Sequence, residues 1–539
     1  MYPEEDPEQP IRQLWLLSVA FVMAVLSPVL LVALVPDGGR SGAWTVTLAI
    51  MVWSGFRTAW IISRGKPYLF EFMFWLFVYI FFGLAATVQI RGGDIASTTP
   101  DVLSDMDWPT SLFLLGSLVT FEVGRLLVRR PDDGEQVGEQ VGADRDVGAP
   151  QRINRKVAWV LLILGLLMNA YYVQQTGLSS FFQSRYARQE ARTVGFADAS
   201  TAAIVSNLAW IPLLVAAGAF AYLRKERRAQ GLSGRYGILV LVAVAGVLLI
   251  INPISGARFT SGTVLFALLC YTGIFRTVAR VRLSLAGIIV AFLFLFPIAD
   301  AFRTDSVNIS RNGFFDEYAG NGDYDAFWQV ANTLSYIASE GITWGRQALG
   351  VVLFWLPRSV WADKPTDTGI LLADFRGYSF TNLSSPLWAE AAINGGVVFA
   401  LLLMAGFGAG LVSLDRRLPR AFSTGGTAAI VGAILPAYMI ILLRGSLLQA
   451  SGALFVMLAS FAFLGVGSKR LDDHDQVVES FDVSESSAGL TRVLPPGPDG
   501  ARPPRYASMQ FDPHYDAPAG PARSASPIRD QGGYESGST

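Results

Sequence analysis

Five arginines stand where apolar stretches of this sequence end or in the polar stretches between them: Arg185, Arg258, Arg303, Arg358 and Arg444. A guanidinium group binds phosphate oxygens in pairs and stays charged at physiological pH. Several of these groups, if they converge, would hold a diphosphate without a metal ion. The plainer interpretation of any one of them is a contact with lipid headgroups.

Acidic residues supply the other candidate chemistry. Glu390 lies at the start of an apolar segment, where an unpaired carboxylate is costly, so it needs either a partner or a catalytic role. The triplet Asp323-Tyr-Asp325 has the form of a metal-binding Asp-x-Asp motif. We interpret that triplet first as the acidic start of a helix, because two aspartates this close are common there.

The remaining composition excludes several kinds of site. The chain has one cysteine, Cys270, and two histidines, His474 and His514, both near the C-terminus. A disulfide framework and a multi-thiolate metal site are therefore excluded. We expect neither a cofactor nor a bound metal. The net charge of -1 gives no indication of nucleic-acid binding.

The elements that must position these residues are apolar helices. Of 539 residues, 52% are hydrophobic and 16% are charged, against roughly 25% charged in soluble proteins. A spanning helix needs about 20 mostly apolar residues. The sequence predicts an all-α, polytopic membrane protein with about twelve such helices, at residues 11–35, 44–62, 68–88, 108–128, 157–173, 202–223, 236–251, 259–275, 283–301, 392–414, 427–443 and 446–466.

Lys and Arg gather in every second loop, which predicts the orientation. With twelve helices, both termini lie in the cytoplasm, residue 230 lies inside and residue 350 outside. Residues 1–10 lack the basic start of a signal peptide, so we expect the first apolar segment to stay as an anchor. Four charged residues within apolar segments are interpreted as reaching toward the cytoplasmic interface: Arg57, Glu71, Glu122 and Arg125.

The outer loop at residues 302–391 is the longest in the transmembrane region of residues 11–470, and a loop of this length is usually functional or disordered. It is rich in tryptophan, which favours order. We expect a helix at 323–339 and an interfacial or re-entrant helix at 343–356. Residues 471–539 are rich in Pro, Gly and Ser and predict a disordered cytoplasmic tail, and residues 135–147 are similar.

Two stretches in and after this loop resemble a known family. The run from Leu353 to Pro365, Leu-Phe-Trp-Leu-Pro-Arg-Ser-Val-Trp-Ala-Asp-Lys-Pro, and the run from Ser384 to Gly396, Ser-Ser-Pro-Leu-Trp-Ala-Glu-Ala-Ala-Ile-Asn-Gly-Gly, are similar to those of bacterial O-antigen and oligosaccharide repeat-unit polymerases. The turn before Arg258 and the helix end at Arg303 also look similar. The resemblance extends in layout over roughly residues 155 to 465.

The resemblance implies a membrane glycosyltransferase with a type-C-like fold that builds a surface polysaccharide. It would join polyprenyl-diphosphate-linked oligosaccharides, without a metal, on the outer face of the cytoplasmic membrane. Expected partners are that lipid-linked substrate, the bilayer, and a chain-length regulator or flippase.

The resemblance also implies residue roles. Arginines would stabilise the leaving diphosphate, and Glu390 would take the proton of the acceptor, with Asp305 or Asp363 as substitutes. Trp361 and Trp388 would stack on sugar rings. The expected site is completed by the following residues: Arg303 and Arg358 as catalytic groups, and Arg185, Arg258, Lys364 and Arg444 as substrate-binding groups.

Three other functions stay open. O-antigen ligases have a similar layout, but they use a histidine in the large outer loop, where this chain has none. A flippase or transporter would tend to show repeated halves and polar groups at mid-membrane, and we find no repeat. A membrane scaffold would not need an aromatic-rich outer loop.

Overall fold

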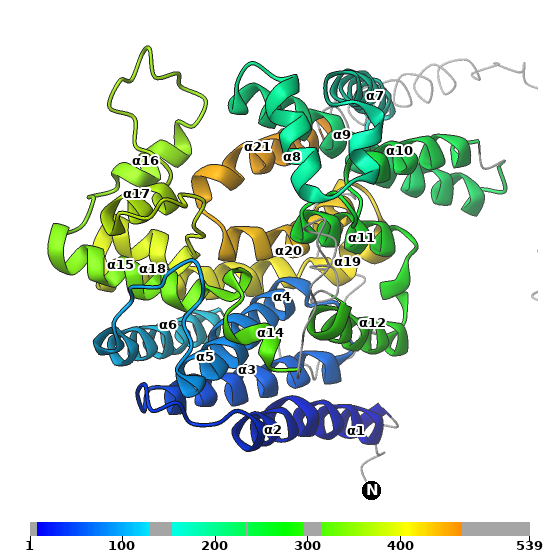
Figure 1. Cartoon of the computed structure of the whole chain (residues 1–539). Coiled ribbons are helices and arrows are strands. Elements are labelled where there is room, and N and C mark those ends of the chain that lie inside the picture. The colour runs from blue at the N-terminus through cyan, green and yellow to red at the C-terminus, as the bar shows by residue number, and fades with distance from the viewer. Residues whose placement is uncertain (1–7, 129–152, 233–234, 296–313, 466–539) are drawn as a thin grey trace, which may run out of the picture. The chain divides into compact units, whose positions relative to one another are not determined.

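The computed structural model describes residues 8–128, 153–232, 235–295 and 314–465. All of them belong to the first of two compact units, Met1–His474. The described part is helical and contains no β-strand. Figure 1 shows helices α1 to α6 stacked beside α18, with α7 to α10 grouped in another part of the bundle.

The helix bounds follow the predicted segments closely. In the first half, the helices are α1 Glu8–Ala20, α2 Ser27–Leu34, α3 Trp44–Arg64, α4 Leu69–Phe77, α5 Ala86–Gly92, α6 Asp107–Leu127, α7 Arg155–Thr176, α8 Arg185–Gly195, α9 Ala199–Ala229 and α10 Gly237–Ile250. In the second half, they are α11 Arg258–Tyr271, α12 Val278–Val290, α14 Asp316–Ala319, α15 Ala326–Glu340, α16 Arg346–Val352, α17 Thr368–Arg376, α18 Leu387–Asp415, α19 Leu418–Thr424, α20 Thr427–Arg444 and α21 Leu447–Gly465. Short π-helical segments join α1 to α2 and α4 to α5.

Ten helices in the described part are long and apolar enough to cross a membrane, so the chain has the architecture of a polytopic membrane protein. The other two predicted segments correspond to α10 and α11, with 14 residues each. At 1.5 Å per residue such a helix is about 21 Å long, short of the roughly 30 Å hydrocarbon core. The count of twelve therefore stays a prediction.

The segment from α4 to α5 is the centre of the larger core, since its apolar window is wholly buried. Phe74 stacks on Phe121 of α6 with ring centroids 3.9 Å apart. Phe77 and Phe82 contact the ring of Trp388 from two sides. This aromatic contact fixes the first turn of α18 against α4, and the start of α18 carries Glu390.

Charged side chains inside the bundle form a network. Arg57 lies 3.4 Å from Glu71 and 2.7 Å from Glu122, and Arg125 also pairs with Glu122. Glu71 is 1% exposed, so the prediction that these four side chains reach the membrane interface is wrong. An ion pair held within the bundle removes the need to reach water, because each charge already has a partner.

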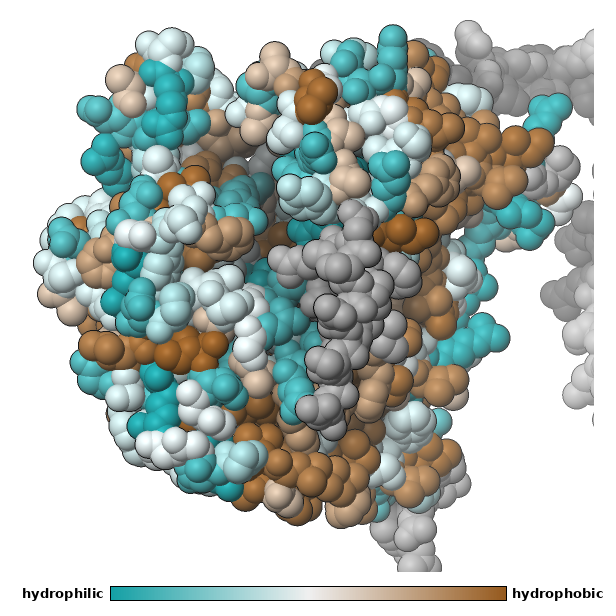
Figure 2. Space-filling view, viewed as in Figure 1, coloured by the Kyte–Doolittle hydropathy of each residue, from teal (hydrophilic) through white to brown (hydrophobic). Residues whose placement is uncertain are grey.

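Apolar side chains also cover much of the surface. On α1 and α2, Leu14, Leu17 and Leu34 are each about two-thirds exposed. Figure 2 shows brown, apolar surface over α1 and α2 at the bottom and over α10 at the right. In water such area would be unfavourable, whereas lipid tails accommodate it. The surface thus agrees with the membrane assignment.

The large loop is only partly described, because Arg303 and Asp305 lie outside the described residues. The segments at 135–147 and 471–539, predicted to be disordered, lie outside them as well. The predicted helix at 323–339 is confirmed as α15, which begins three residues later. Of the predicted interfacial helix at 343–356, the structure has the seven-residue α16, and its place at the interface stays a prediction. Trp344 and Trp355 flank it and are 85% and 65% exposed. Exposed tryptophans of this kind are typical of a membrane interface.

Candidate functional site

A polar pocket of about 940 Å³ lies where α20 ends, α21 begins and α11 begins. Its walls also include Arg185 at the start of α8, the 3-10 turn Gly322–Tyr324, and parts of the loops at residues 97–100 and 377–384. α20 is 18 residues long, so its two ends are about 27 Å apart. The pocket is therefore at the opposite end of α20 from the basic cluster Arg416, Arg417 and Arg420.

Asp323 lies between two of the predicted arginines. Its carboxylate pairs closely with Arg258, and its other oxygen lies 3.4 Å from a terminal nitrogen of Arg444. Arg444 also donates through Nε to the backbone oxygen of Asp323 at 3.0 Å. Arg258, Asp323 and Arg444 are 7%, 15% and 17% exposed, so water screens the pairs only weakly.

Asp325 fixes the same turn from behind. Its carboxylate accepts hydrogen bonds from the hydroxyl of Ser384 at 2.7 Å, the hydroxyl of Thr98 at 2.9 Å and the amide of Gln329 at 3.1 Å. Arg444 lies 3.6 Å from it. With side chains from three other segments bound, Asp325 is a positioning group that holds Asp323 at the pocket.

The turn before α11 places Arg258. Oδ1 of Asn252 accepts the amide hydrogens of Ile254 and Ser255, which closes the turn. The Ser255 hydroxyl donates to the backbone oxygen of Phe181, and Arg188 donates to that hydroxyl at 3.1 Å. Burial lowers the pKa of the Arg188 guanidinium. The segment between α7 and α9, which contains Phe181 and Arg188, thus fastens the start of α11, where Arg258 is the first helical residue.

Arg444 is the last residue of α20, and its side chain packs over the ring of Phe259. Its guanidinium lies over Phe259 of α11, 5.3 Å from the ring centroid. A cation over an aromatic face is stabilised by the ring quadrupole. Arg258 and Arg444, 186 positions apart in the chain, therefore meet around one carboxylate.

Glu390 does not line this pocket. Its carboxylate is 2% exposed and accepts hydrogen bonds from the Thr368 hydroxyl at 2.9 Å and the Leu447 amide at 3.2 Å. Between it and the pocket lies Ser446, whose hydroxyl is close to both Glu390 and Asp367. Burial raises the pKa of the Asp367 carboxyl. The predicted base thus has hydrogen-bond partners, and one of them, the Leu447 amide, directly follows Ser446 of the pocket lining; the Ser446 hydroxyl itself forms no hydrogen bond with any described residue.

The Asn394-Gly-Gly part of the second motif has a structural role. Oδ1 of Asn394 accepts the amide hydrogen of Ala348 at 2.9 Å at the start of α16, and its Nδ2 donates to the backbone oxygen of Glu390. Gly396 has φ +79° inside α18, a conformation that other residues rarely adopt. These residues fasten α16 and the kinked start of α18 together.

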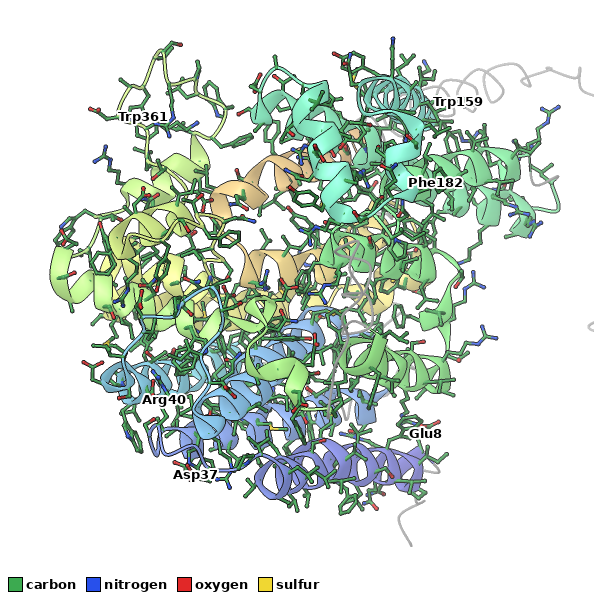
Figure 3. The ribbon with its side chains drawn as sticks, in the orientation of Figure 1. Glu8, Asp37, Arg40, Trp159, Phe182 and Trp361 are labelled. Atoms are coloured by element: carbon green, nitrogen blue, oxygen red, sulfur yellow. The ribbon has the colours of Figure 1, made fainter. Side chains whose placement is uncertain are left out.

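The first motif forms a closed loop of its own. Arg358 is exposed and donates to the backbone oxygens of Lys364 and Pro365, at 2.8 Å and 3.5 Å. Lys364 donates to the backbone oxygens of Phe354 and Leu356. Figure 3 shows Trp361 on the loop that projects beyond α16. The pocket lining includes none of Arg358, Trp361 and Lys364, so this conformation does not bring them to Asp323.

Trp388 is a core residue rather than a surface for a sugar. Its side chain is 0% exposed, and its ring nitrogen donates to the Ser117 hydroxyl at 2.7 Å. With Phe74, Phe77 and Phe82 around the ring, no face remains for a ligand. The expectation that Trp388 stacks on a sugar is therefore corrected: an apolar ring two positions before Glu390 packs into the bundle.

Of the predicted site residues, the structure brings Arg185, Arg258 and Arg444 to one place. It adds Asp323 and Asp325, which the sequence suggested first as the acidic start of a helix and second as a metal-binding motif. The Asp-Tyr-Asp triplet was the signal, but its pairing with distant arginines has no sequence pattern. Within the described residues, no group of three side chains that bind metal lies together.

Comparison with protein-family models, with curated proteins and with solved structures finds no match for this chain. The fold and the pocket geometry are thus the grounds on which its function is considered. They define a polytopic helical membrane protein with a buried arginine–aspartate cluster that faces a polar pocket.

Proposed function

We propose that this chain is a membrane glycosyltransferase that polymerises oligosaccharide repeat units carried on polyprenyl diphosphate. The observation that carries the proposal is the convergence of Arg258 and Arg444 on the Asp323 carboxylate, beside a pocket that Arg185, Asp323 and Arg444 line. Two guanidinium groups that already surround an anionic group are arranged to accept a phosphate in its place.

The volume and polarity of the pocket support a sugar ligand beside the phosphate. Hydroxyl and amide side chains from separate segments face it, including Ser97, Asn382 and Gln449. Tyr378 and Phe380 supply aromatic surface in the same wall. Aromatic surface with a few polar groups is typical of small-molecule sites.

The reaction balances as follows. A hydroxyl oxygen of the acceptor sugar bonds to the anomeric carbon of the donor glycan, and the bond from that carbon to the diphosphate oxygen breaks. The polyprenyl diphosphate leaves with the bonding electron pair, and Arg258, Arg444 and Arg185 stabilise its charge. The hydroxyl proton passes to a carboxylate.

Two carboxylates are placed for that proton. Asp323 lines the pocket, and a diphosphate that takes its arginines would free it to act as a base. Glu390 would act through the Ser446 hydroxyl. Asp323→Asn and Glu390→Gln separate the two: the base is the residue whose replacement removes the acidic limb of the rate–pH profile, where activity rises as the base loses its proton.

The test is made in a strain whose own copy is deleted and replaced by each variant, with surface glycan length read on a gel. We expect single-repeat product with no long chains from Arg258→Gln and Arg444→Gln. The matched control is Arg192→Gln, two helical turns from Arg185 on α8 and outside the pocket lining, which should give normal lengths. Membrane insertion of every variant is checked on blots.

Other outcomes decide against the proposal. Full-length chains left on their lipid carrier in the deletion strain would indicate a ligase, and substrate accumulated inside would indicate a flippase. Normal chain lengths from both pocket variants would make the diphosphate role of the arginines wrong. Strong inhibition by a chelator would instead favour Asp323 and Asp325 as metal ligands.

Arg303 and Arg358 provide a further comparison. Arg303→Ala and Arg358→Ala are expected to abolish long chains if the large loop closes over the pocket during the reaction. Arg358 hydrogen-bonds only within its own loop in the described part of the structure, so a normal Arg358→Ala product would limit the site to the pocket itself.

A further inference from the structure

A second site lies near the other end of the bundle, and its argument is independent of the proposed glycosyl transfer. Two adjoining pockets of about 570 Å³ and 540 Å³ share Lys225 of α9 and Arg276, together with the rings of Phe275 and Phe422. The first pocket is also lined by Arg224 and Arg228. These cations belong to stretches of the sequence that the charge pattern assigns to the cytoplasmic side.

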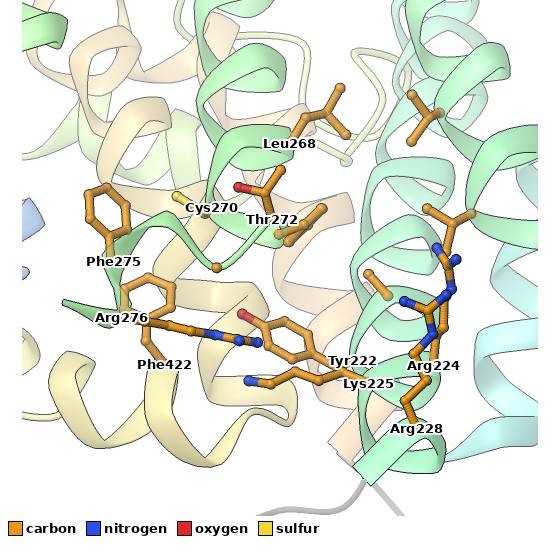
Figure 4. A pocket seen from close by; sticks show the side chains of 15 residues that line it. Tyr222, Arg224, Lys225, Arg228, Leu268, Cys270, Thr272, Phe275, Arg276 and Phe422 are labelled. Atoms are coloured by element: carbon orange, nitrogen blue, oxygen red, sulfur yellow. The ribbon is translucent and has the colours of Figure 1, made fainter. Parts of the chain in front are cut away.

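The cations face one another rather than an acid. Figure 4 shows the side chains of Lys225 and Arg276 running toward each other, and the hydroxyl of Tyr222 next to them. Their charges are close enough to interact. Within the described residues, Arg224, Lys225, Arg228 and Arg276 form no ion pair, and the buried Nε of Arg224 has no hydrogen-bond partner. Like charges gathered in this way are unfavourable unless an anion joins them.

The apolar residues that line the first pocket indicate what kind of anion fits it. Val240, Val244 and Leu268 line it beside the cations. Leu268 is adjacent to Leu269, which is 37% exposed, and Leu241 on α10 is 68% exposed. Val240, Val244 and Leu268 are themselves partly exposed, so the apolar wall belongs in part to a surface of the kind that faces lipid tails. A soluble anion would gain nothing from such a wall, whereas an acyl chain would.

We propose that this pocket binds one anionic phospholipid of the cytoplasmic leaflet. Its phosphate lies between Lys225 and Arg276, with Tyr222 as a hydrogen-bond donor, and an acyl chain lies along Leu268 and Val244. Basic pockets between helices on the cytoplasmic side are typical phospholipid headgroup sites. The lipid would join α9, α11 and the segment before α12, which all contribute to the lining.

The experiment uses the full chain, purified in mild detergent with phosphatidylcholine and titrated with phosphatidylglycerol, and counts bound lipid by native mass spectrometry. We expect one tightly bound phosphatidylglycerol per chain. Lys225→Gln with Arg276→Gln should weaken its binding about 25-fold, since each cation contributes roughly a fivefold effect near an anionic headgroup. Tyr222→Phe should weaken it less.

The matched control removes the same charge from the same face. Arg280→Gln with Arg417→Gln changes two exposed cations outside both pocket linings and should leave the affinity within about twofold. Lys225→Arg with Arg276→Lys keeps the charge and should bind as the unchanged chain does, which separates loss of charge from loss of folding. Equal weakening in both charge-removing pairs would overturn the proposal. So would displacement of the lipid by millimolar inorganic phosphate, because that result would indicate a site for a soluble anion.

Discussion

Replacement of either partner in the Arg444–Asp323 pair should change the binding of polyprenyl diphosphate in opposite directions. If Arg444 binds the diphosphate, Arg444→Gln removes a charged donor, and a hydrogen bond to a charged group contributes about 1.5–3 kcal/mol. The affinity should therefore fall by roughly 10- to 100-fold. Asp323→Asn removes the anion that competes for the same guanidinium, so the affinity should rise.

The size of that rise follows from the burial of the pair. Exposed ion pairs contribute about 0–1 kcal/mol, and breaking a fully buried pair costs about 3–5 kcal/mol. Arg444 and Asp323 are 17% and 15% exposed, which places their interaction between the two cases, at about 2 kcal/mol. A ligand that no longer has to displace Asp323 should bind roughly 10- to 30-fold more tightly.

The assay is the fluorescence anisotropy of a labelled polyprenyl diphosphate added to the purified chain in lipid nanodiscs. Arg192→Gln is the control, with an affinity expected within about twofold of the unchanged chain. Thermal unfolding of each variant shows whether it is folded. A fall in affinity for both pocket variants would indicate that the pair only maintains the shape of the pocket. Unchanged affinity in both would mean that the diphosphate binds elsewhere.

Three further predictions concern the support of the site. Burial raises the pKa of Asp367 above its ordinary 3.8, so the folded chain holds this proton more tightly than the unfolded chain. The stability that this proton contributes is complete below about pH 3.8 and is lost as the pH rises through the raised pKa. Asp367→Asn should therefore flatten this part of the plot of unfolding temperature against pH. Trp388→Ala should cost about 3–5 kcal/mol of stability, measured by unfolding, with ligand affinity per folded chain unchanged. Asp415 accepts the amide hydrogens of Phe70 and Glu71 at 2.9 Å and 2.8 Å, so Asp415→Ala should cost about 2 kcal/mol and Asp415→Asn less; equal losses would mean that these bonds contribute little.

The helical membrane architecture could be predicted from the sequence because it depends on long apolar stretches and the cost of unpaired backbone in lipid. The same reasoning placed α15 and the short α16 in the large loop. It misassigned Arg57, Glu71, Glu122 and Arg125, because a charge inside an apolar segment looks the same whether it reaches the interface or pairs with another helix. Whether such a charge reaches the interface or pairs with another charge depends on which helices pack beside it.

The candidate site shows the same division. The sequence identified Arg258 and Arg444 by their places at the ends of apolar segments, and Arg185 by its place in the outer loop between the segments at 157–173 and 202–223. It did not reveal that Arg258 and Arg444 meet around Asp323, because that contact depends on how α11 and α20 end beside the turn Gly322–Tyr324.

For this protein, then, the kinds of residue along the chain determined that it crosses a membrane and which charges call for a partner, since transfer into lipid depends on local composition. Only the tertiary structure decided which charges face the pocket. It also showed that Trp388 is part of the core and that Glu390 is buried outside the pocket lining. The physical reason is that burial and ion pairing depend on packing between helices far apart in sequence. Arg258 and Arg444 meet around Asp323, with Arg185 in the same pocket, only because three helix ends and one turn come together there.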